Sequence, residues 1–211
     1  MFTTLRNAWK IPDLRKKLLF TLLILVIYRL GNCITVPFVD TGLLATAFEQ
    51  LSTTILGLYD AMSGSAFSSA TVFALSIQPY INASIIIQLL TIAIPSLERL
   101  AKEGGEEGKK KIAQITRYTT VGLGLLLGFA YYTMIKSYGI LTDSGVLSAI
   151  VIILAFTAGS SVVMWMGEQI TEFGIGNGIS MILFANIISS LPSGLSTLLA
   201  IDWWISLIIV V

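Results

Sequence analysis

Five long apolar runs separated by short polar segments dominate the sequence. They cover residues 18–36, 76–94, 115–135, 146–166 and, from about Ile179, a stretch that ends near Leu191–Pro192. A helix needs about 20 apolar residues to cross a bilayer, so each run predicts one crossing. An outer turn is predicted at residues 190–196. A sixth run begins at Asp202 and stops at Val211, which predicts the truncated start of a further crossing in a fragment of a longer chain.

The segments between the runs differ in character. Residues 37–58 lack Lys and Arg and predict an outer loop with a short helix over Leu43–Leu51. Residues 57–75 carry too many Ser, Thr and Asp side chains for a simple lipid-facing helix. They predict either a re-entrant segment or an ordinary extracellular loop. Residues 96–113 predict an exposed hairpin-like loop, which is either a solvated connector or a docking surface.

Positive charge is concentrated in two short stretches. They hold eleven of the thirteen Lys and Arg residues: Arg6, Lys10, Arg15, Lys16 and Lys17, then Arg99, Lys102, Lys109, Lys110, Lys111 and Arg117. Short basic loops stay on the cytoplasmic side of a membrane. We therefore expect a cytoplasmic N-terminus over residues 1–17, a cytoplasmic segment at 96–113 and an even number of crossings between them.

Composition predicts an all-α, polytopic membrane helix bundle and argues against several function classes. Apolar residues make up 55% of the chain and charged residues 12%, against about 25% charged in soluble domains. There is no His and a single Cys, Cys33, so we expect neither a metal cluster nor an internal disulfide. No nucleophile–base pair and no cofactor motif occurs, which argues against an enzyme. The net charge of +1 argues against nucleic-acid binding.

Arg29 is the one ionisable residue that lies clearly inside an apolar run. A charge within the bilayer is costly, and we expect Arg29 to snorkel or to form a structural pair rather than to act in transport. Half of a small-solute secondary transporter is an alternative function, but a coupled carrier usually has an acidic residue or His at mid-membrane. A secretory signal peptide is excluded because the first run is too long and no cleavage site follows it.

The densest motif lies between the fourth and fifth runs, where residues 167–180 contain a Gly-x-Gly-x-Gly core. A phosphate-binding loop is not expected, because no strand precedes this core and no Gly-Lys-Ser/Thr ends it. We expect a tight cytoplasmic turn with Asn177 or Ser180 near the start of the next helix.

Residues 164–180 closely resemble a signature of the SecY family, the central subunits of the protein-translocation channel. Three further matches lie in the family's order at residues 28–31, 63–90 and 108–118. The resemblance implies ten crossings in two five-helix halves of inverted topology around an hourglass pore. Residues 18–201 are then the N-terminal half, and residues 58–75 resemble the plug that blocks the outer funnel.

The implied function is the passage of secretory polypeptides across the bacterial plasma membrane and the release of membrane helices into it. A half chain is expected to be inactive alone. The implied partners are SecE- and SecG-like small membrane subunits, a SecA-like motor, the ribosome, the translocating polypeptide and the lipid bilayer. The motor and the ribosome are expected to dock mainly on the half that this chain lacks.

The resemblance also assigns roles to individual residues. It places four residues in the hydrophobic pore ring, although helical spacing alone is typical of packing or lipid-facing residues: Ile77, Ile81, Ile179 and Leu183. It places six in the plug, with serine at position 65 where the family usually has glycine: Asp60, Ser63, Gly64, Ser65, Phe67 and Ser68. The polar face of the gate helix carries Gln78, Asn82 and Gln88. The cytoplasmic loop carries Arg99, Lys109, Lys110 and Lys111.

Overall fold

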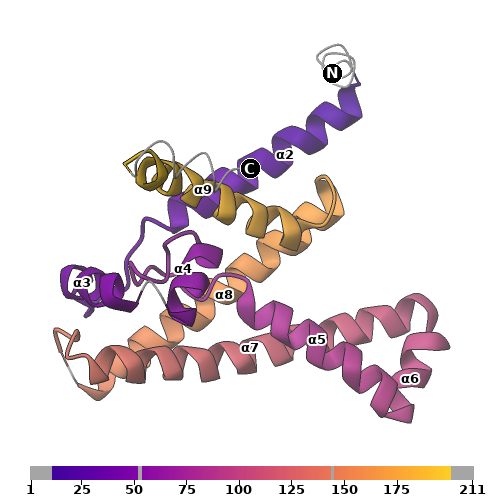
Figure 1. Cartoon of the computed structure of the whole chain (residues 1–211). Helices are drawn as coiled ribbons and strands as arrows, with labels where there is room; N and C mark the ends of the chain where they lie inside the picture. The colour runs from indigo at the N-terminus through magenta and orange to yellow at the C-terminus, as the bar shows by residue number, and fades with distance from the viewer. Residues whose placement is uncertain (1–10, 52–53, 144, 201–211) are drawn as a thin grey trace.

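The computed structural model describes residues 11–51, 54–143 and 145–200, and these residues form an all-helical fold (Figure 1). The helices in chain order are α2 (Pro12–Gly31), α3 (Thr41–Leu51), α4 (Ile55–Ser63), α5 (Gln78–Ala93), α6 (Pro95–Lys102), α7 (Gly105–Ser137), α8 (Val146–Phe173) and α9 (Gly178–Ala200). Sheet-like pairing within the described residues is limited to isolated bridges, Thr35 with Thr71 and Val39 with Leu141. The predicted sixth run, residues 202–211, lies outside the described residues, as do residues 1–10 of the basic N-terminus.

Small residues bring α7 and α8 into close contact. A β-carbon at Gly124 of α7 would lie 3.1 Å from Ser160 Oγ and 3.3 Å from Thr157 Cγ2 of α8. A β-carbon at Gly128 would lie 3.3 Å from the Ile153 carbonyl oxygen. Small side chains let membrane helices approach closely, so these two glycines bring α7 onto α8.

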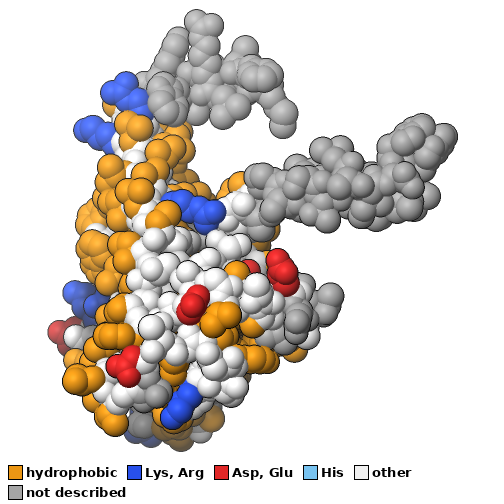
Figure 2. Space-filling model, turned by 90° about the vertical axis from the view of Figure 1, so that its left-hand side faces the viewer, with side chains coloured by type: hydrophobic (Ala, Val, Ile, Leu, Met, Phe, Trp, Pro, Cys, Tyr) orange, Lys and Arg blue, Asp and Glu red, His pale blue; other side chains and the backbone are white. Residues whose placement is uncertain are grey.

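Only part of the predicted set of crossings is supported. Within the described residues, α7 and α8 are each long and apolar enough to span a membrane. The pair α5 and α6 qualifies together, but the chain bends by 102° between them. The described residues therefore support two or three crossings, and the predicted count of five is not confirmed. Hydrophobic side chains cover an extended flank of the molecule with few charges among them, as a lipid environment requires (Figure 2).

Three predicted boundaries are wrong. Residues 96–113 do not form a loop, because α6 ends at Lys102 and α7 begins at Gly105. A β-carbon at Gly108 would lie 2.1 Å from the Leu100 carbonyl oxygen, so this glycine lets the two helices pack. The outer turn predicted at 190–196 is also absent, since α9 continues to Ala200. The first helix, α2, ends at Gly31 rather than at residue 36.

The chain after α4 returns through turns to the end of α2. The backbone N–H of Val36 donates to the Ala70 carbonyl, and that of Val72 donates to the Ile34 carbonyl, both at 2.9 Å. Gly159 of α8 allows this backbone to lie directly on the helix, since a β-carbon there would lie 1.9 Å from the Val72 carbonyl oxygen. Residues 58–75 are thereby fixed between α2, α7 and α8.

Candidate functional site

One apolar cluster contains all four residues predicted for the pore ring. It joins α2, α5, α8 and α9 around the buried side chains of Ile77 and Ile182. Ile77 is fully buried at the start of α5, whereas the other three are half-buried at the edge of the cluster: Ile81, Ile179 and Leu183. The fold therefore brings the α5 pair and the α9 pair together. Their role as a ring stays a prediction.

The turn before α9 positions two of these residues. The Asn177 Oδ1 atom accepts hydrogen bonds from the backbone N–H groups of Ile179, at 3.0 Å, and Ser180, at 3.3 Å. This is an N-cap, and it confirms the expected helix start at Asn177. Gly178 lies so close to α8 that a β-carbon would be 1.9 Å from the Gly167 carbonyl oxygen. The glycine-rich motif thus packs the start of α9 against α8.

Phe67 of the plug-like segment is the centre of an aromatic cluster. The aromatic cluster consists of Phe48, Tyr59, Phe67, Tyr131 and Phe156. The Phe67 ring centroid lies 4.4 Å from that of Tyr131, 4.8 Å from that of Tyr59 and 5.3 Å from that of Phe48. The Tyr131 hydroxyl also donates to the Phe67 carbonyl. Burial raises the pKa of Tyr59 to about 12, so this ring stays neutral at physiological pH.

The polar residues of the plug-like segment bond to its own backbone. The Asp60 carboxylate accepts from the Ser68 N–H at 2.7 Å, and the Asp60 carbonyl accepts from the Ser65 N–H at 3.0 Å. The Ser63 hydroxyl accepts from the Phe67 N–H at 3.0 Å. Gly64 and Ser65 both have left-handed backbone angles, with φ of 68° and 64°. The polar side chains that set this segment apart in the sequence therefore close its turn.

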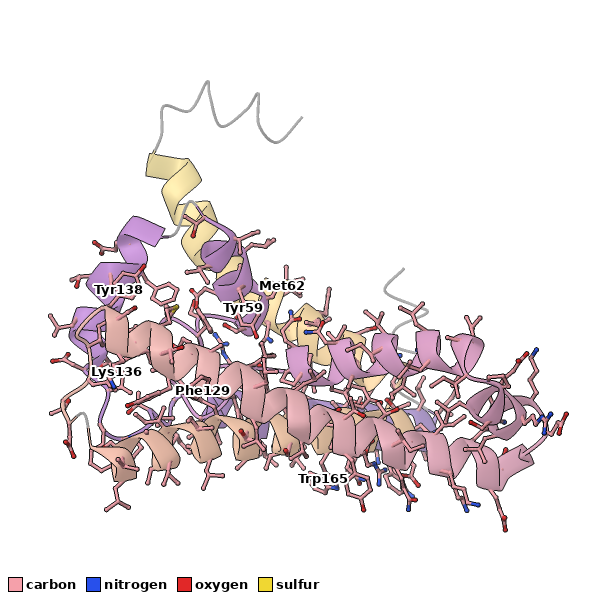
Figure 3. All side chains as sticks on the ribbon, turned by 90° about the horizontal axis from the view of Figure 1, so that it is seen from below. Tyr59, Met62, Phe129, Lys136, Tyr138 and Trp165 are labelled. Carbon is pink, nitrogen blue, oxygen red and sulfur yellow. The ribbon has the colours of Figure 1, made fainter. Side chains whose placement is uncertain are left out.

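A second, polar contact holds the end of α4, and sequence reasoning missed its central residue. The polar junction consists of Tyr28, Arg29, Ser76 and Asn186 with the carbonyls of Met62 and Gly64. The Asn186 Nδ2 atom lies 2.9 Å from the Met62 carbonyl oxygen and 3.0 Å from the Tyr28 hydroxyl. Arg29 Nη1 donates to the Gly64 carbonyl at 3.3 Å, in line with the expected structural role of this residue. In Figure 3, Met62 lies beside α9.

The polar residues of α5 are divided between this contact and the surface. Gln78 is half-buried, and its Nε2 atom lies 3.6 Å from the Met62 sulfur. Asn82 and Gln88 are exposed, and Gln88 bonds to Ser84 on its own helix at 3.2 Å. Within the described residues Gln78 contacts α4 while Asn82 and Gln88 face outward, and their shared role at a gate stays a prediction.

The basic residues predicted for the cytoplasmic loop lie exposed on α6 and at the start of α7: Arg99, Lys109, Lys110 and Lys111. Lys109 pairs with Glu106 at 3.1 Å. A further pair joins α7 to α8, where Arg117 makes a two-pronged contact with Glu168, each at 2.9 Å. This pair borders a cavity of about 320 Å³ that is also lined by Ile179. The described residues contain no group of three or more side chains suited to hold a metal ion.

Solved structures of protein-conducting channels share this fold. Canine Sec61 in a ribosome–channel complex from the endoplasmic reticulum superimposes with a TM-score of 0.62 at 19% identity, covering 84% of this chain and 37% of that one. A SecY structure described for a plug domain that stabilises the closed state of the translocation channel gives 0.59 at 20% identity, covering 82% and 35%. At these identities the likeness shows the fold alone.

Sequence comparison is closer. Protein translocase subunit SecY of Streptomyces coelicolor is 46% identical over 207 residues, which cover 92% of this chain and 47% of the relative. SecY of Bacillus subtilis is 43% identical over 196 residues, covering 91% and 44%. The chain thus spans about half the length of the curated relatives it matches. The SecY family model matches residues 71–211, two thirds of the chain, and the chain therefore belongs to the SecY family.

Proposed function

We propose that this chain contributes the pore-forming wall of a protein-conducting channel in the bacterial plasma membrane. The channel passes secretory polypeptides across the membrane and releases membrane helices into it. Curated relatives that bear the name protein translocase subunit SecY support this function. These names favour a channel over half of a small-solute transporter. The Arg29 bond to a backbone carbonyl agrees, because it gives the one charge within an apolar run a structural role.

The observation that carries the proposal is the meeting of two apolar pairs beside the plug-like segment. Ile77 and Ile81 come from α5, Ile179 and Leu183 come from α9, and all four join one cluster. An apolar constriction excludes ions, since an ion there loses its hydration without replacement. Three of these side chains are only half-buried within this chain, and they are available to line such a constriction. Residues 58–75 are proposed to be the plug.

The proposed topology has five crossings, α2, α5, α7, α8 and α9, with a cytoplasmic N-terminus. It rests on two basic segments, one that ends at residue 17 and one that begins at residue 99, with an even number of crossings between them. It also rests on the long apolar helices α7 and α8. Single cysteines at Glu49 and Glu106 in a Cys33→Ser background test it by labelling with a membrane-impermeant reagent. Glu49 is expected outside and Glu106 inside, and labelling from the same side contradicts the topology.

The proposed partners follow the family. SecE- and SecG-like subunits are expected along the apolar flank, and a SecA-like motor and the ribosome on the cytoplasmic side. The exposed basic residues of α6 and α7 support a cytoplasmic contact surface. The exposed amides of Asn82 and Gln88 on α5 support a gate that faces another part of the channel or the passing polypeptide.

The pore assignment is tested in a chimera in which residues 1–211 replace the matching residues of Streptomyces coelicolor SecY. Ile81→Asn places an amide in the apolar constriction, and we expect a raised ion conductance across a planar bilayer. Leu154→Asn is the matched control, because Leu154 is 54% exposed on the outer face of α8. A tight Ile81→Asn channel, or an equal leak in both variants, contradicts the assignment.

A further inference from the structure

We propose that Asn186 and Arg29 hold the plug in place by bonding to the backbone at the C-terminal end of α4, an inference that rests on the proposed role of residues 58–75. The two side chains come from α9 and α2, far from α4 in sequence. Each reaches a carbonyl in or just after the last turn of α4, at Met62 and at Gly64. The last carbonyls of a helix have no partner within the helix and carry partial negative charge, so amide and guanidinium donors suit them.

The amide orientation of Asn186 follows from its surroundings. Asn186 is fully buried, and its Nδ2 group also lies 3.3 Å from the Ser76 hydroxyl, which in turn bonds to the Tyr28 hydroxyl at 3.2 Å. The two hydroxyls can donate or accept, but the Met62 carbonyl only accepts. A flipped amide would set Oδ1 against that carbonyl. In the observed orientation Oδ1 has no hydrogen-bond partner among the described residues. The bond to the Met62 carbonyl therefore determines which way the amide points.

Gly64 is what lets the two side chains approach. A β-carbon on this residue would lie 3.0 Å from Asn186 Oδ1, 3.1 Å from Arg29 Nη1 and 3.1 Å from Ser189 Oγ. Its φ of 68° is in addition a conformation that favours glycine. Any larger residue would push the polar groups apart and strain the turn. The contact therefore depends on the backbone of the plug and on one glycine.

This arrangement couples the plug to the pore ring through α9. Ile179 and Leu183 lie on the same helix as Asn186, and Leu183 is three residues from it, close to one face. A polypeptide that pushes α9 outward at the ring would draw the Asn186 amide away from Met62. Widening of the ring and release of the plug then become one event. Arg29, on α2, is the second hold that has to break.

Hydrogen–deuterium exchange of the full chain in lipid nanodiscs tests the proposal. Asn186→Asp keeps the shape of the side chain but removes the N–H donor when the carboxyl is ionised, and Asn186→Leu removes it at any protonation state. We expect amide exchange in residues 55–68 to rise by about tenfold in both variants, since each loses a buried hydrogen bond. Gly64→Ala is expected to act in the same direction. Exchange in the contact of α7 with α8 serves as the internal reference.

Ser189→Ala is the matched control on the same helix. The Ser189 hydroxyl donates to the Asn186 carbonyl of α9 at 2.6 Å, and its loss leaves the bonds to α4 intact. Unchanged exchange of residues 55–68 in both Asn186 variants, or an equal rise in Ser189→Ala, overturns the proposal. If the Asn186 variants also raise exchange in α7 and α8, the test rests on Arg29→Gln, which changes an exposed residue of the polar junction. Exchange of residues 55–68 at the wild-type rate in Arg29→Gln then refutes the proposal. A different outcome separates this proposal from the proposed function. If exchange of residues 55–68 rises as expected but the Ile81→Asn chimera does not leak ions, the pore assignment is wrong and the contact at α4 stands.

Discussion

The plug-like segment is held at two places by different kinds of contact. At Phe67, the aromatic cluster surrounds a large apolar side chain, which is only 5% exposed. At Met62 and Gly64, the polar junction bonds to backbone carbonyls of the segment. Apolar burial is strong but has no direction, whereas hydrogen bonds demand particular distances and angles.

The aromatic cluster and the polar junction therefore contribute differently to holding the segment. Burial of Phe67 contributes about 1.5–3 kcal/mol to holding the segment against α7, which exceeds the net contribution of about 1 kcal/mol from one neutral hydrogen bond. The polar junction contributes less free energy but fixes where the end of α4 lies. A contact of this kind is lost after a small displacement, while the aromatic cluster tolerates sliding. The polar end is therefore the place at which release would begin.

The largest expected effect comes from breaking the aromatic cluster. Phe67→Ala leaves a cavity beside three rings, and we expect residues 55–75 to lose about 3–5 kcal/mol of local stability. Hydrogen exchange of this segment in the full chain measures the loss. Phe129→Ala is the matched control, because Phe129 is 57% exposed on α7 (Figure 3). An equal effect of the two substitutions would show that Phe67 is not the main apolar contact of the segment.

A smaller effect is expected from the one hydrogen bond inside the aromatic cluster. Tyr131→Phe removes the hydroxyl that donates to the Phe67 carbonyl, but this carbonyl keeps the N–H of Ala70 at 3.2 Å. The expected loss is therefore about 1 kcal/mol rather than the full cost of an unpaired carbonyl. Exchange of the Phe67 region measures it.

The control for this bond is the neighbouring buried tyrosine. Tyr132→Phe is expected to change exchange in the Phe67 region by much less, because Tyr132 is buried like Tyr131 but the hydroxyl that donates to the Phe67 carbonyl is that of Tyr131. If the two substitutions weaken the segment equally, the bond to the Phe67 carbonyl contributes nothing beyond packing. The aromatic cluster would then hold the segment by apolar packing alone.

Sequence patterns predicted the apolar contacts of this fold better than the polar ones. The apolar run from residue 146 predicted the start of α8, and the short helix expected over Leu43–Leu51 is α3, because burial leaves a pattern over many neighbouring residues. The meeting of Ile77 with Ile179 followed from the family resemblance, since spacing alone does not say what a helix faces. The loop predicted at residues 96–113 was wrong because its charged residues lie on two helices, α6 and α7, which Gly108 lets pack together.

Asn186 shows why the polar junction escaped prediction. It is a single amide in an apolar run, and its hydroxyl and carbonyl partners lie up to 158 residues away in sequence. No local pattern distinguishes such a residue from an amide that joins two helices in the membrane. A single amide in a run whose other polar residues are serines is the available signal, and it marks the position without identifying the partner.

The smallest expected effect lies at the turn that links the two contacts, and its sign is the informative part. Ser65 has a φ of 64°, a conformation that costs a residue with a β-carbon about 1 kcal/mol but costs glycine little. Glycine in turn loses more conformational freedom on folding, which offsets part of that gain. We therefore expect Ser65→Gly to stabilise residues 55–68 by about 0.5 kcal/mol, seen as slower hydrogen exchange. Ser68→Gly makes the same chemical change three residues on, where φ is negative, and should destabilise the segment instead. If both substitutions shift exchange in the same direction, backbone strain at Ser65 is not what limits this turn.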